Sequence, residues 1–502
     1  MLTDERRARA TLATVCAAAL IVPITAAGAA ETLASVGAGL HSGLAATQWV
    51  VNAFFLTFAA FMASTGSLAD RFGHRRMFAI GLVVFTAAML AAAAAPGIGA
   101  LIAARALAGA GAAAVTTGGS ALLAHVFPDG PARARAFAVF GTTLGLGLAF
   151  GPVLSGALVT VLGWRSLFAA AALALLPSLA AVRLLPVSRP GAAGRPDLGG
   201  AVTFTGGLTG FTLAVVEGPE TGWTHPVVLA GFAACVVLLT AFAVIERRHP
   251  APLVDLALLR KPRFVAIASM PFLLAFGFVA LTIVLPPYLM ATLGYSARQA
   301  GLTLMLLTGP ALVMPPVTGA LARRLTQRTL LVATLLLVAA GTALLATVPG
   351  GTGPAGLAAP LLLIGTGFGI SLAIMDGAAI SAVAPHQSGM AAGVFNTVRI
   401  TGEVVAIAAL GAVISALTHT ALATRYGTPT ATKATTNLLQ GTPTPPPAVP
   451  QATYEPTATA AYTHALHVSL LTLTLLTLLG AAAVAHLLTP HHTPEPTHDL
   501  AA

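Results

Sequence analysis

The chain has 502 residues, of which 57% are hydrophobic and only 8% are charged, and its formal net charge is +10. Soluble globular domains carry about 25% charged residues, so this composition excludes an ordinary soluble protein and indicates a polytopic membrane protein. The basic residues lie in short segments between apolar runs, so the positive charge is a signal of membrane orientation and not of nucleic-acid binding.

Apolar segments long enough to cross a bilayer recur along the chain. A helix needs roughly 20 residues for this, and uncharged stretches such as 136–164 and 299–322 reach that length. They lack the alternating polarity of transmembrane β-strands, so an all-α polytopic membrane protein is expected. We place fourteen transmembrane helices, in chain order at 11–34, 49–68, 77–95, 98–123, 136–161, 166–184, 198–216, 226–245, 264–288, 299–320, 329–348, 355–381, 389–417 and 464–488.

The distribution of basic residues predicts the orientation of these helices. Nineteen arginines and lysines fall before the first helix or in connections on that same side, whereas the opposite side carries only Arg165, Arg298, Arg425 and Lys433. Because cytoplasmic loops are enriched in Lys and Arg, and because an even number of helices returns the chain to its starting side, both termini are expected in the cytoplasm. The protein is thus expected to be a multi-pass protein of the cell membrane.

Longer connections divide the chain into parts. Residues 1–184 and 264–488 each hold six predicted helices, and residues 185–263 hold two additional helices with flanking cytoplasmic loops. The Pro- and Thr-rich segment 418–463 is expected to be an external loop within the second six-helix bundle. Residues 489–502 are expected to form a cytoplasmic tail.

A short charged hairpin joins the second and third predicted helices. It reads GSLADRFGHRR over residues 66–76, with a glycine on either side of Asp70. Glycine allows neighbouring backbones to approach closely, whereas the charged side chains have to stay out of the lipid. The corresponding segment 319–328 has Arg323 and Thr326 where the first copy has Asp70 and Gly73, so an internal repeat is visible but degraded.

Two further predicted helices carry residues that are unusual in an apolar span. Arg105 lies within the helix at 98–123, where its charge costs roughly 2.5 to 3.5 kcal/mol, so it should face the protein interior. The helix at 136–161 has a series of glycines that allows close helix packing, and a proline that bends it. The residues concerned are Gly147, Gly151, Pro152 and Gly156.

These motifs, in this order, resemble the major facilitator superfamily and, within it, the fourteen-helix drug:proton antiporter family. Trp164 and Arg165, residues 217–223 and residues 389–399 are similar to further segments of that family, so the resemblance covers nearly the whole chain. It implies two six-helix bundles plus two inserted helices, which rock about a central cavity and export small molecules in exchange for protons.

The resemblance also implies roles for the motif residues. Asp70 would contact a helix N-terminus in the other half and latch one conformation, which the helix dipole favours. Arg105 would take part in proton coupling, although a purely structural clamp is an alternative. The residues of the cytoplasmic gate would be Gly66, Asp70, Arg71, Gly73, Arg75 and Arg76, and the helix 5 antiporter motif would be Gly147, Gly151, Pro152 and Gly156.

Three acidic residues lie within or near the spans and are candidates for carrying a proton, because a carboxyl group in low dielectric can bind and release one as its access alternates. The family usually has an aspartate where this chain has Thr25, so Glu31 either replaces it or lies at the external mouth. Asp376 has no basic neighbour one turn away on its helix. Arg399 and Glu403 are four residues apart and form either an ion pair or a proton relay. The candidate proton-coupling residues are Glu31, Arg105, Asp376, Arg399 and Glu403.

The leading functional hypothesis is a proton-coupled antiporter that exports amphipathic small molecules, such as drugs or antibiotics, by alternating access. An importer or facilitator on the same scaffold is the second reading. A membrane-embedded enzyme is the third, and it lacks a recognisable metal-binding or nucleophilic motif. The expected partners are an amphipathic substrate, protons and the lipid bilayer, with no nucleic acid, no metal and no cofactor.

Overall fold

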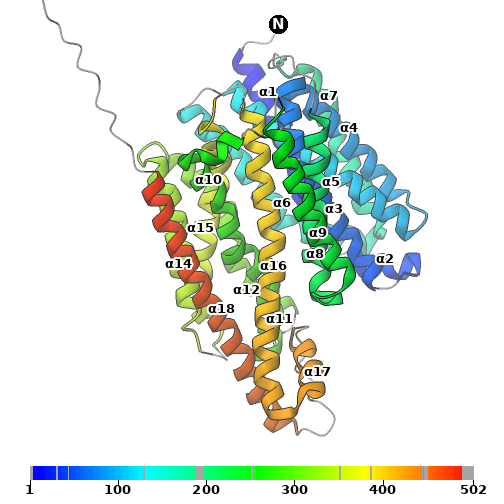
Figure 1. Ribbon diagram of the computed structural model, residues 1–502, viewed down its shortest axis with the longest axis vertical. Coiled ribbons are helices and arrows are strands. Elements are labelled where there is room, and N and C mark those ends of the chain that lie inside the picture. The colour runs from blue at the N-terminus through cyan, green and yellow to red at the C-terminus, as the bar shows by residue number, and fades with distance from the viewer. Residues whose placement is uncertain are drawn as a thin grey trace, which may run out of the picture.

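The protein is an all-helical bundle with its long axis along the helices (Figure 1). The computed structural model describes residues 4–29, 32–42, 44–127, 130–187, 197–249, 254, 256–295, 297–349, 352–384, 387–439, 441, 443, 445 and 450–488. The first half contains α1 (Asp4–Gly28), α2 (Leu33–Leu40), α3 (Leu44–Phe72), α4 (His74–Ala93), α5 (Ile98–Val126), α6 (Pro131–Leu162) and α7 (Arg165–Ala181). They are followed by α8 (Leu198–Thr221) and α9 (Pro226–Glu246).

The second half continues with α10 (Pro262–Leu274), a π-helical turn (Ala275–Val279), α11 (Ala280–Leu293), α12 (Ala297–Thr308), α13 (Pro310–Leu321), α14 (Gln327–Leu345), α15 (Pro354–Ser381), α16 (Ser388–Tyr426), α17 (Thr428–Leu439) and α18 (Gln451–Leu487). The predicted span 264–288 therefore consists of α10, the π turn and α11. The span predicted at 299–320 is interrupted at Gly309, which precedes the proline that begins α13.

Within the described residues, thirteen helical segments are long and apolar enough to cross a membrane. They correspond to the predicted spans with one exception, α8, whose described apolar part covers only Gly199–Val215. The first span is shifted towards the N-terminus relative to the prediction, since α1 covers Asp4–Gly28 and the separate short helix α2 begins at Leu33.

The apolar residues form two large cores, one on each side of the molecule. One core is built mainly from α1 to α7, with Ile380 of α15 and Ala392 and Ile400 of α16 packed into it, and the other is built from α10 to α18. Helices α8 and α9 pack against each other where Gly210 and Gly231 leave room for close backbone approach. A third, small core joins this pair to both halves, because Phe242 of α9 packs with Ala63 of α3 and Val394 of α16.

The two halves approach each other most closely near the end of the molecule at which α3 ends and α4 begins, here called the basic end. A Cβ atom on Gly66 of α3 would lie 2.8 Å from the Cα atom of Gly393 of α16 and would strike the carbonyl oxygen of Gly389. Deeper in the bundle, a Cβ atom on Gly145 of α6 would lie 2.7 Å from the carbonyl oxygen of Ala311 on α13. Glycine is therefore required at these crossings.

The opposite end, here called the far end, is more helical than the sequence indicated. Helix α16 has 39 residues and so is about 58 Å long, well beyond the roughly 30 Å of a bilayer core. Helix α17 and the first turns of α18 occupy most of the remaining segment 418–463 at this end (Figure 1). The part of the predicted external loop that the structure describes is thus largely helical.

Substitution of Gly66 tests the crossing of α3 and α16. We expect Gly66→Ala to push the basic ends apart, because an inserted methyl group in a tight contact costs about 1–3 kcal/mol. Spin labels on Arg135→Cys and Arg324→Cys, which replace exposed residues of the two halves at this end, should report longer distances by pulsed electron paramagnetic resonance. Gly156→Ala is the matched control, because nothing lies within 4 Å of the added Cβ atom. Unchanged distances in Gly66→Ala would contradict the expectation.

Candidate functional site

At the basic end, the carboxylate of Asp70 bridges the two halves. Its Oδ1 accepts a hydrogen bond from the backbone N–H of Gly389 at 2.7 Å, and its Oδ2 accepts one from Met390 at 2.6 Å. These are N–H groups of the first turn of α16, which have no partner within their own helix. The negative charge also lies at the positive end of the helix dipole. Asp70 therefore fastens α3 to the N-terminus of α16, the contact that the resemblance implied.

His74, on the first turn of α4, reinforces this contact from the other side. Its Nε2 lies 3.0 Å from Oδ1 of Asp70, and its ring centroid lies 5.9 Å from that of His125 on α5. Between Asp70 and His74 the chain turns at Gly73, whose φ of 95° suits glycine and not residues with a side chain. The turn at Gly73 thus brings the side chains of Asp70 on α3 and His74 on α4 together at the N-terminus of α16.

One arginine of the hairpin is tied to another part of the first half. Nη2 of Arg75 is 3.4 Å from the carbonyl oxygen of Arg183, which ties α4 to the turn after α7. Arg71 is half-buried, and Arg76 is exposed. Of the predicted gate residues, Gly66, Asp70 and Gly73 therefore shape the contact between α3, α4 and α16, whereas the arginines add positive charge at its edge.

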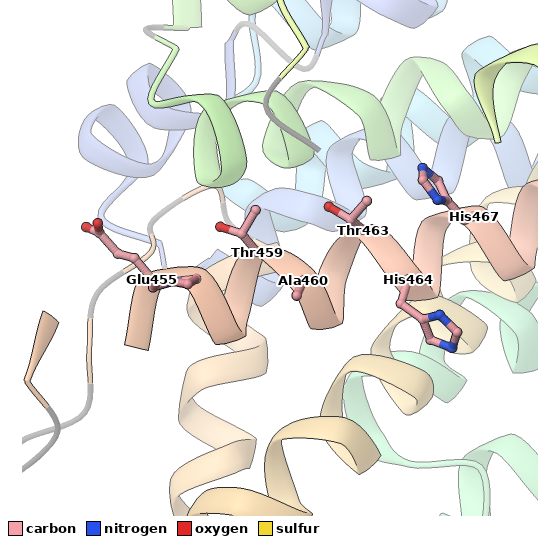
Figure 2. A pocket seen from close by; sticks show the side chains of 7 residues that line it. Glu455, Thr459, Ala460, Thr463, His464 and His467 are labelled. Atoms are coloured by element: carbon pink, nitrogen blue, oxygen red, sulfur yellow. The ribbon is translucent and has the colours of Figure 1, made fainter. Parts of the chain in front are cut away.

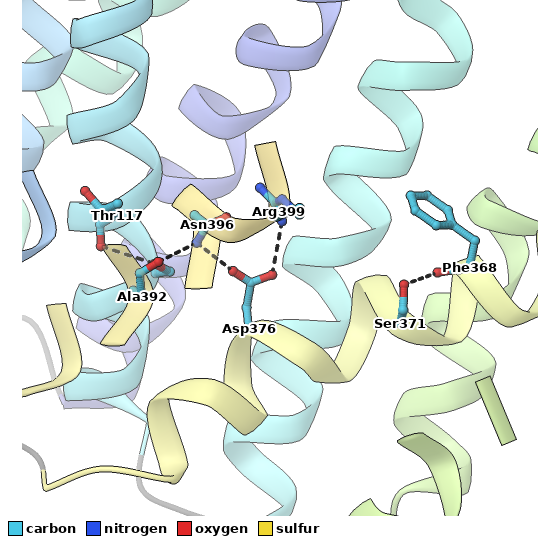
Figure 3. A network of polar contacts seen from close by, with 8 residues as sticks. Thr117, Phe368, Ser371, Asp376, Ala392, Asn396 and Arg399 are labelled. Carbon is cyan, nitrogen blue, oxygen red and sulfur yellow. Dashed lines mark hydrogen bonds and ion pairs between the residues drawn. The ribbon is translucent and has the colours of Figure 1, made fainter. Parts of the chain in front are cut away.

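A second polar centre lies between α15 and α16 (Figure 3). Oδ1 of Asp376 accepts a hydrogen bond from Nδ2 of Asn396 at 3.2 Å, and its Oδ2 lies 3.5 Å from Nη1 of Arg399. The side chains of Asp376 and Asn396 are buried, whereas Arg399 is about one-fifth exposed. The basic partner that Asp376 lacks along its own helix is thus supplied by the neighbouring helix.

The other predicted acidic residues are placed differently. Among the described side chains, Glu403 makes no ion pair with Arg399, which points to Asp376 instead. Glu403 lies one turn further along α16 and is half-buried. Glu31 lies outside the described residues, and Thr25, at the position where the family usually has an aspartate, donates its hydroxyl to the carbonyl oxygen of Ile21.

Arg105 lies about two turns from the start of α5 and is fully buried. Its Nε donates to the carbonyl oxygen of Val50 at 2.9 Å, whereas Nη1 and Nη2 have no hydrogen-bond partner among the described residues. The guanidinium carbon lies 4.4 Å from the centre of the Phe54 ring. Arg105 faces the protein interior as expected, but it lies against an aromatic side chain and not an acid.

The glycines of α6 divide into two sets. Gly147 and Gly151 face Pro23 and Ile24 of α1, so they bring α6 close to another helix of the same half. Gly156 has open space where a Cβ atom would be, although it belongs to the same predicted motif. Pro152 lies within the continuous helix α6.

A groove of about 540 Å³ runs along α18 towards the far end (Figure 2). Glu455, Thr459, Thr463 and His467 follow one another at intervals of four residues and line it, together with His464. Thr463 also shares a hydrogen bond of 3.0 Å with the hydroxyl of Tyr288 on α11. None of the predicted site residues lies in this groove. The described residues contain no group of three or more His, Cys, Asp or Glu side chains that could hold a metal ion.

Three contributors to these centres were missed by the sequence analysis. His74 lies within the charged hairpin that the sequence singled out, but its contact with Asp70 depends on the turn at Gly73, because the two residues belong to different helices. Asn396 lies within the segment 389–399 that carries the resemblance, but its position one turn from Arg399 gives no sign of its partner on α15. The ring of Phe168 lies 5.8 Å from the guanidinium carbon of Arg105, a position that depends on how α5 and α7 pack.

Comparison with known proteins settles the family. The sequence profile of the Major Facilitator Superfamily matches residues 10–407. The chain belongs to this superfamily. It is therefore a multi-pass membrane transporter and not an enzyme, and the predicted family is confirmed.

Relatives within the superfamily are resistance and export proteins. The puromycin resistance protein of Streptomyces alboniger is 36% identical over 84% of this chain and 84% of its own length. The cephamycin export protein of Amycolatopsis lactamdurans is 35% identical over 83% of this chain and 87% of its own. The multidrug resistance protein Stp of Mycobacterium tuberculosis is 32% identical over 74% and 69%.

Solved structures of the superfamily share the fold. The human organic anion transporter MFSD10 superposes with a TM-score of 0.61 at 16% identity, covering 96% of this chain and 100% of its own. The proton:xylose symporter XylE gives a TM-score of 0.59 at 12% identity, covering 96% and 95%. At these identities the likeness concerns the fold alone.

The Asp70 contact can be tested by Asp70→Asn. The amide keeps the shape of the side chain but loses its charge and one acceptor, so we expect the closed basic end to lose about 1–2 kcal/mol, a factor of roughly 5 to 30 in its equilibrium. The spin-label pair at residues 135 and 324 should then show an increased population at long distance. Glu5→Gln, which removes an exposed acid at the same end, should leave the distances unchanged. An unaltered distribution in Asp70→Asn would show that the contact is energetically neutral.

Proposed function

We propose that this protein is a proton-coupled antiporter that exports amphipathic small molecules, of the drug and antibiotic class, across the cytoplasmic membrane by alternating access. The observation that carries the proposal is the similarity, over most of the chain, to proteins that are named for export or resistance. The relatives are named for different antibiotics, puromycin, methylenomycin A, cephamycin and tetracenomycin C among them. An amphipathic substrate is part of the proposal.

The arrangement of the halves supports alternating access. Their tight crossings, through Gly66, Gly145 and the carboxylate of Asp70, lie between the basic end and the middle of the bundle. The conformation is one in which the basic end is closed. To open it, the first turn of α16 has to leave Asp70, and its N–H groups then need water in place of the carboxylate.

The pair of Asp376 and Arg399 is the proposed proton site. The next residue after Asp376 is Gly377, which faces the ring of Phe137 on α6 of the other half. A Cβ atom added to Gly377 would lie 3.5 Å from that ring. Its ionisation is therefore positioned to respond to the separation of the halves. A proton on Asp376 abolishes the ion pair with Arg399, and its release restores the pair, so the charge state of the centre changes once per proton.

The energy available from one proton is sufficient for export. Moving one elementary charge across 100 mV releases about 2.3 kcal/mol, which supports roughly a fiftyfold substrate gradient. No cofactor is needed, since the proton gradient supplies the driving force.

In the membrane, both termini are assigned to the cytoplasm and α8 is assigned as the fourteenth span. The arginine-rich connections support this orientation. Helix α8 is 24 residues long and is antiparallel to the apolar helix α9, against which it packs. If both α8 and α9 span the membrane, the chain returns to the side on which it left the first half. The basic connections of the second half then lie on the same side as those of the first half.

An importer or facilitator on the same scaffold is the alternative. It predicts that substrate accumulates on the cytoplasmic side, or equilibrates without a proton gradient. Transport in inside-out vesicles distinguishes these cases, because an exporter fills the vesicles only when their lumen is acidic.

The topology can be tested with single cysteines in a chain whose Cys16 and Cys235 have been replaced by serine. We expect Trp223→Cys to react with a membrane-impermeant maleimide added to intact cells. Val187→Cys and Arg248→Cys, which replace exposed residues, should react only in inside-out vesicles. Equal accessibility of residues 187 and 223 would show that α8 does not span the membrane.

The proton site can be tested with Asp376→Asn in inside-out vesicles that contain a pH-sensitive dye. Puromycin, methylenomycin A, a cephamycin and tetracenomycin C are the probes. We expect Asp376→Asn to lose proton release on addition of a probe while it still equilibrates that probe, because the amide cannot bind and release a proton.

Asp197→Asn is the matched control for the proton site. Asp197 is as buried as Asp376 but caps α8 through the N–H of Gly200, and asparagine is an equally good cap. Glu31→Gln and Glu403→Gln complete the comparison. Normal proton release in Asp376→Asn would move the assignment to one of these residues, and failure of the unaltered protein to export any of the four probes would contradict the proposed function.

A further inference from the structure

The surroundings of Arg105 are unusual for a buried cation. The side chain is fully buried, and its contacts with the described residues are one backbone carbonyl and two aromatic rings. A buried guanidinium remains charged, and it is ordinarily compensated by a carboxylate. Here the compensation comes from other groups.

Two phenylalanines from different helices enclose the guanidinium. Its central carbon lies 4.4 Å from the ring centroid of Phe54 on α3 and 5.8 Å from that of Phe168 on α7. Both rings are fully buried. An aromatic face carries negative electrostatic potential and attracts a cation within about 6 Å, most strongly where water is excluded.

Neighbouring side chains hold the two rings in place. Phe54 stacks on Phe58 with centroids 5.4 Å apart, and Phe168 meets Trp164 edge-to-face at 6.2 Å. Trp164 in turn lies under the guanidinium of Arg165, at 4.2 Å. The rings are thus fixed by packing that does not involve Arg105 itself.

We propose that Phe54 and Phe168 are positioning residues that hold Arg105 charged and in place for proton coupling, in the role that a carboxylate would otherwise have. The inference rests on the proposed function, in which Arg105 takes part in coupling. The rings lie close to the guanidinium without replacing its hydrogen bonds, since Nη1 and Nη2 have no hydrogen-bond partner among the described residues. A carboxylate partner would occupy those donors and neutralise the charge permanently.

The test measures the coupling ratio, which is the number of protons released per probe molecule exported, in inside-out vesicles with the best exported of the four probes. A loss of structure lowers both fluxes together, whereas a loss of positioning lowers the ratio. We expect Phe54→Leu to lower the ratio about tenfold and Phe54→Tyr to retain it. Replacement of Phe54 by mono-, di- and trifluorophenylalanine should lower the ratio stepwise, since fluorine weakens the potential of the ring face with little change in size.

Phe85→Leu is the matched control, because Phe85 is equally buried and contacts α5 at Gly111 without being among the rings that face Arg105. It should leave the ratio unchanged. A flat response across the fluorinated series, together with a low ratio in Arg105→Lys and Arg105→Ala, would overturn the aromatic positioning and leave the role of Arg105 intact. A normal ratio in Arg105→Ala would overturn both.

Discussion

The contact between the Asp70 carboxylate and the first turn of α16 is the constraint on which this conformation depends. It joins a fixed negative charge on one half to the unpaired N–H groups and the dipole of a helix on the other. A second polar contact at this end is weaker, since Nη1 of Arg133 on α6 donates to the hydroxyl of Ser381 on α15 at 3.3 Å, and the close approach of α3 to α16 relies on small residues. Glycines at positions 66, 389 and 393 bring the backbones near enough for the carboxylate to reach both amides.

The second polar centre, between α15 and α16, holds an acidic side chain inside the bundle through few and long contacts. Asp376 has one charged and one neutral partner, Arg399 and Asn396, and the ion pair at 3.5 Å is not a tight one. A buried carboxylate held by two short charged hydrogen bonds would resist protonation. The pair is instead divided between two helices, α15 and α16, and this looser arrangement is compatible with the proton site proposed above.

Much of the fold was predictable, because apolar length alone locates membrane helices. The hairpin at residues 66–76 and Arg105 were also found, since charge is conspicuous in an apolar chain. The contacts between side chains of different helices could not be predicted, because they depend on how each helix is rotated about its axis and how deeply each residue lies in the bundle. The partner of Asp376 lies on another helix, the rings around Arg105 come from two others, and the Ala- and Thr-rich residues after 417 continue α16 beyond the membrane where hydropathy no longer reports a helix.

Helix α16 is continuous from Ser388 to Tyr426, and this has a mechanical consequence. Its first turn is held by Asp70, its fourth carries Arg399, and its last contacts α17 and, through Tyr426, the ring of Tyr454 on α18. A stiff rod that pivots near its centre moves its two tips in opposite directions. Release of the first turn at the basic end would therefore move the tip that carries Tyr426 in the opposite direction, so the same helix can open one end of the bundle while it closes the other.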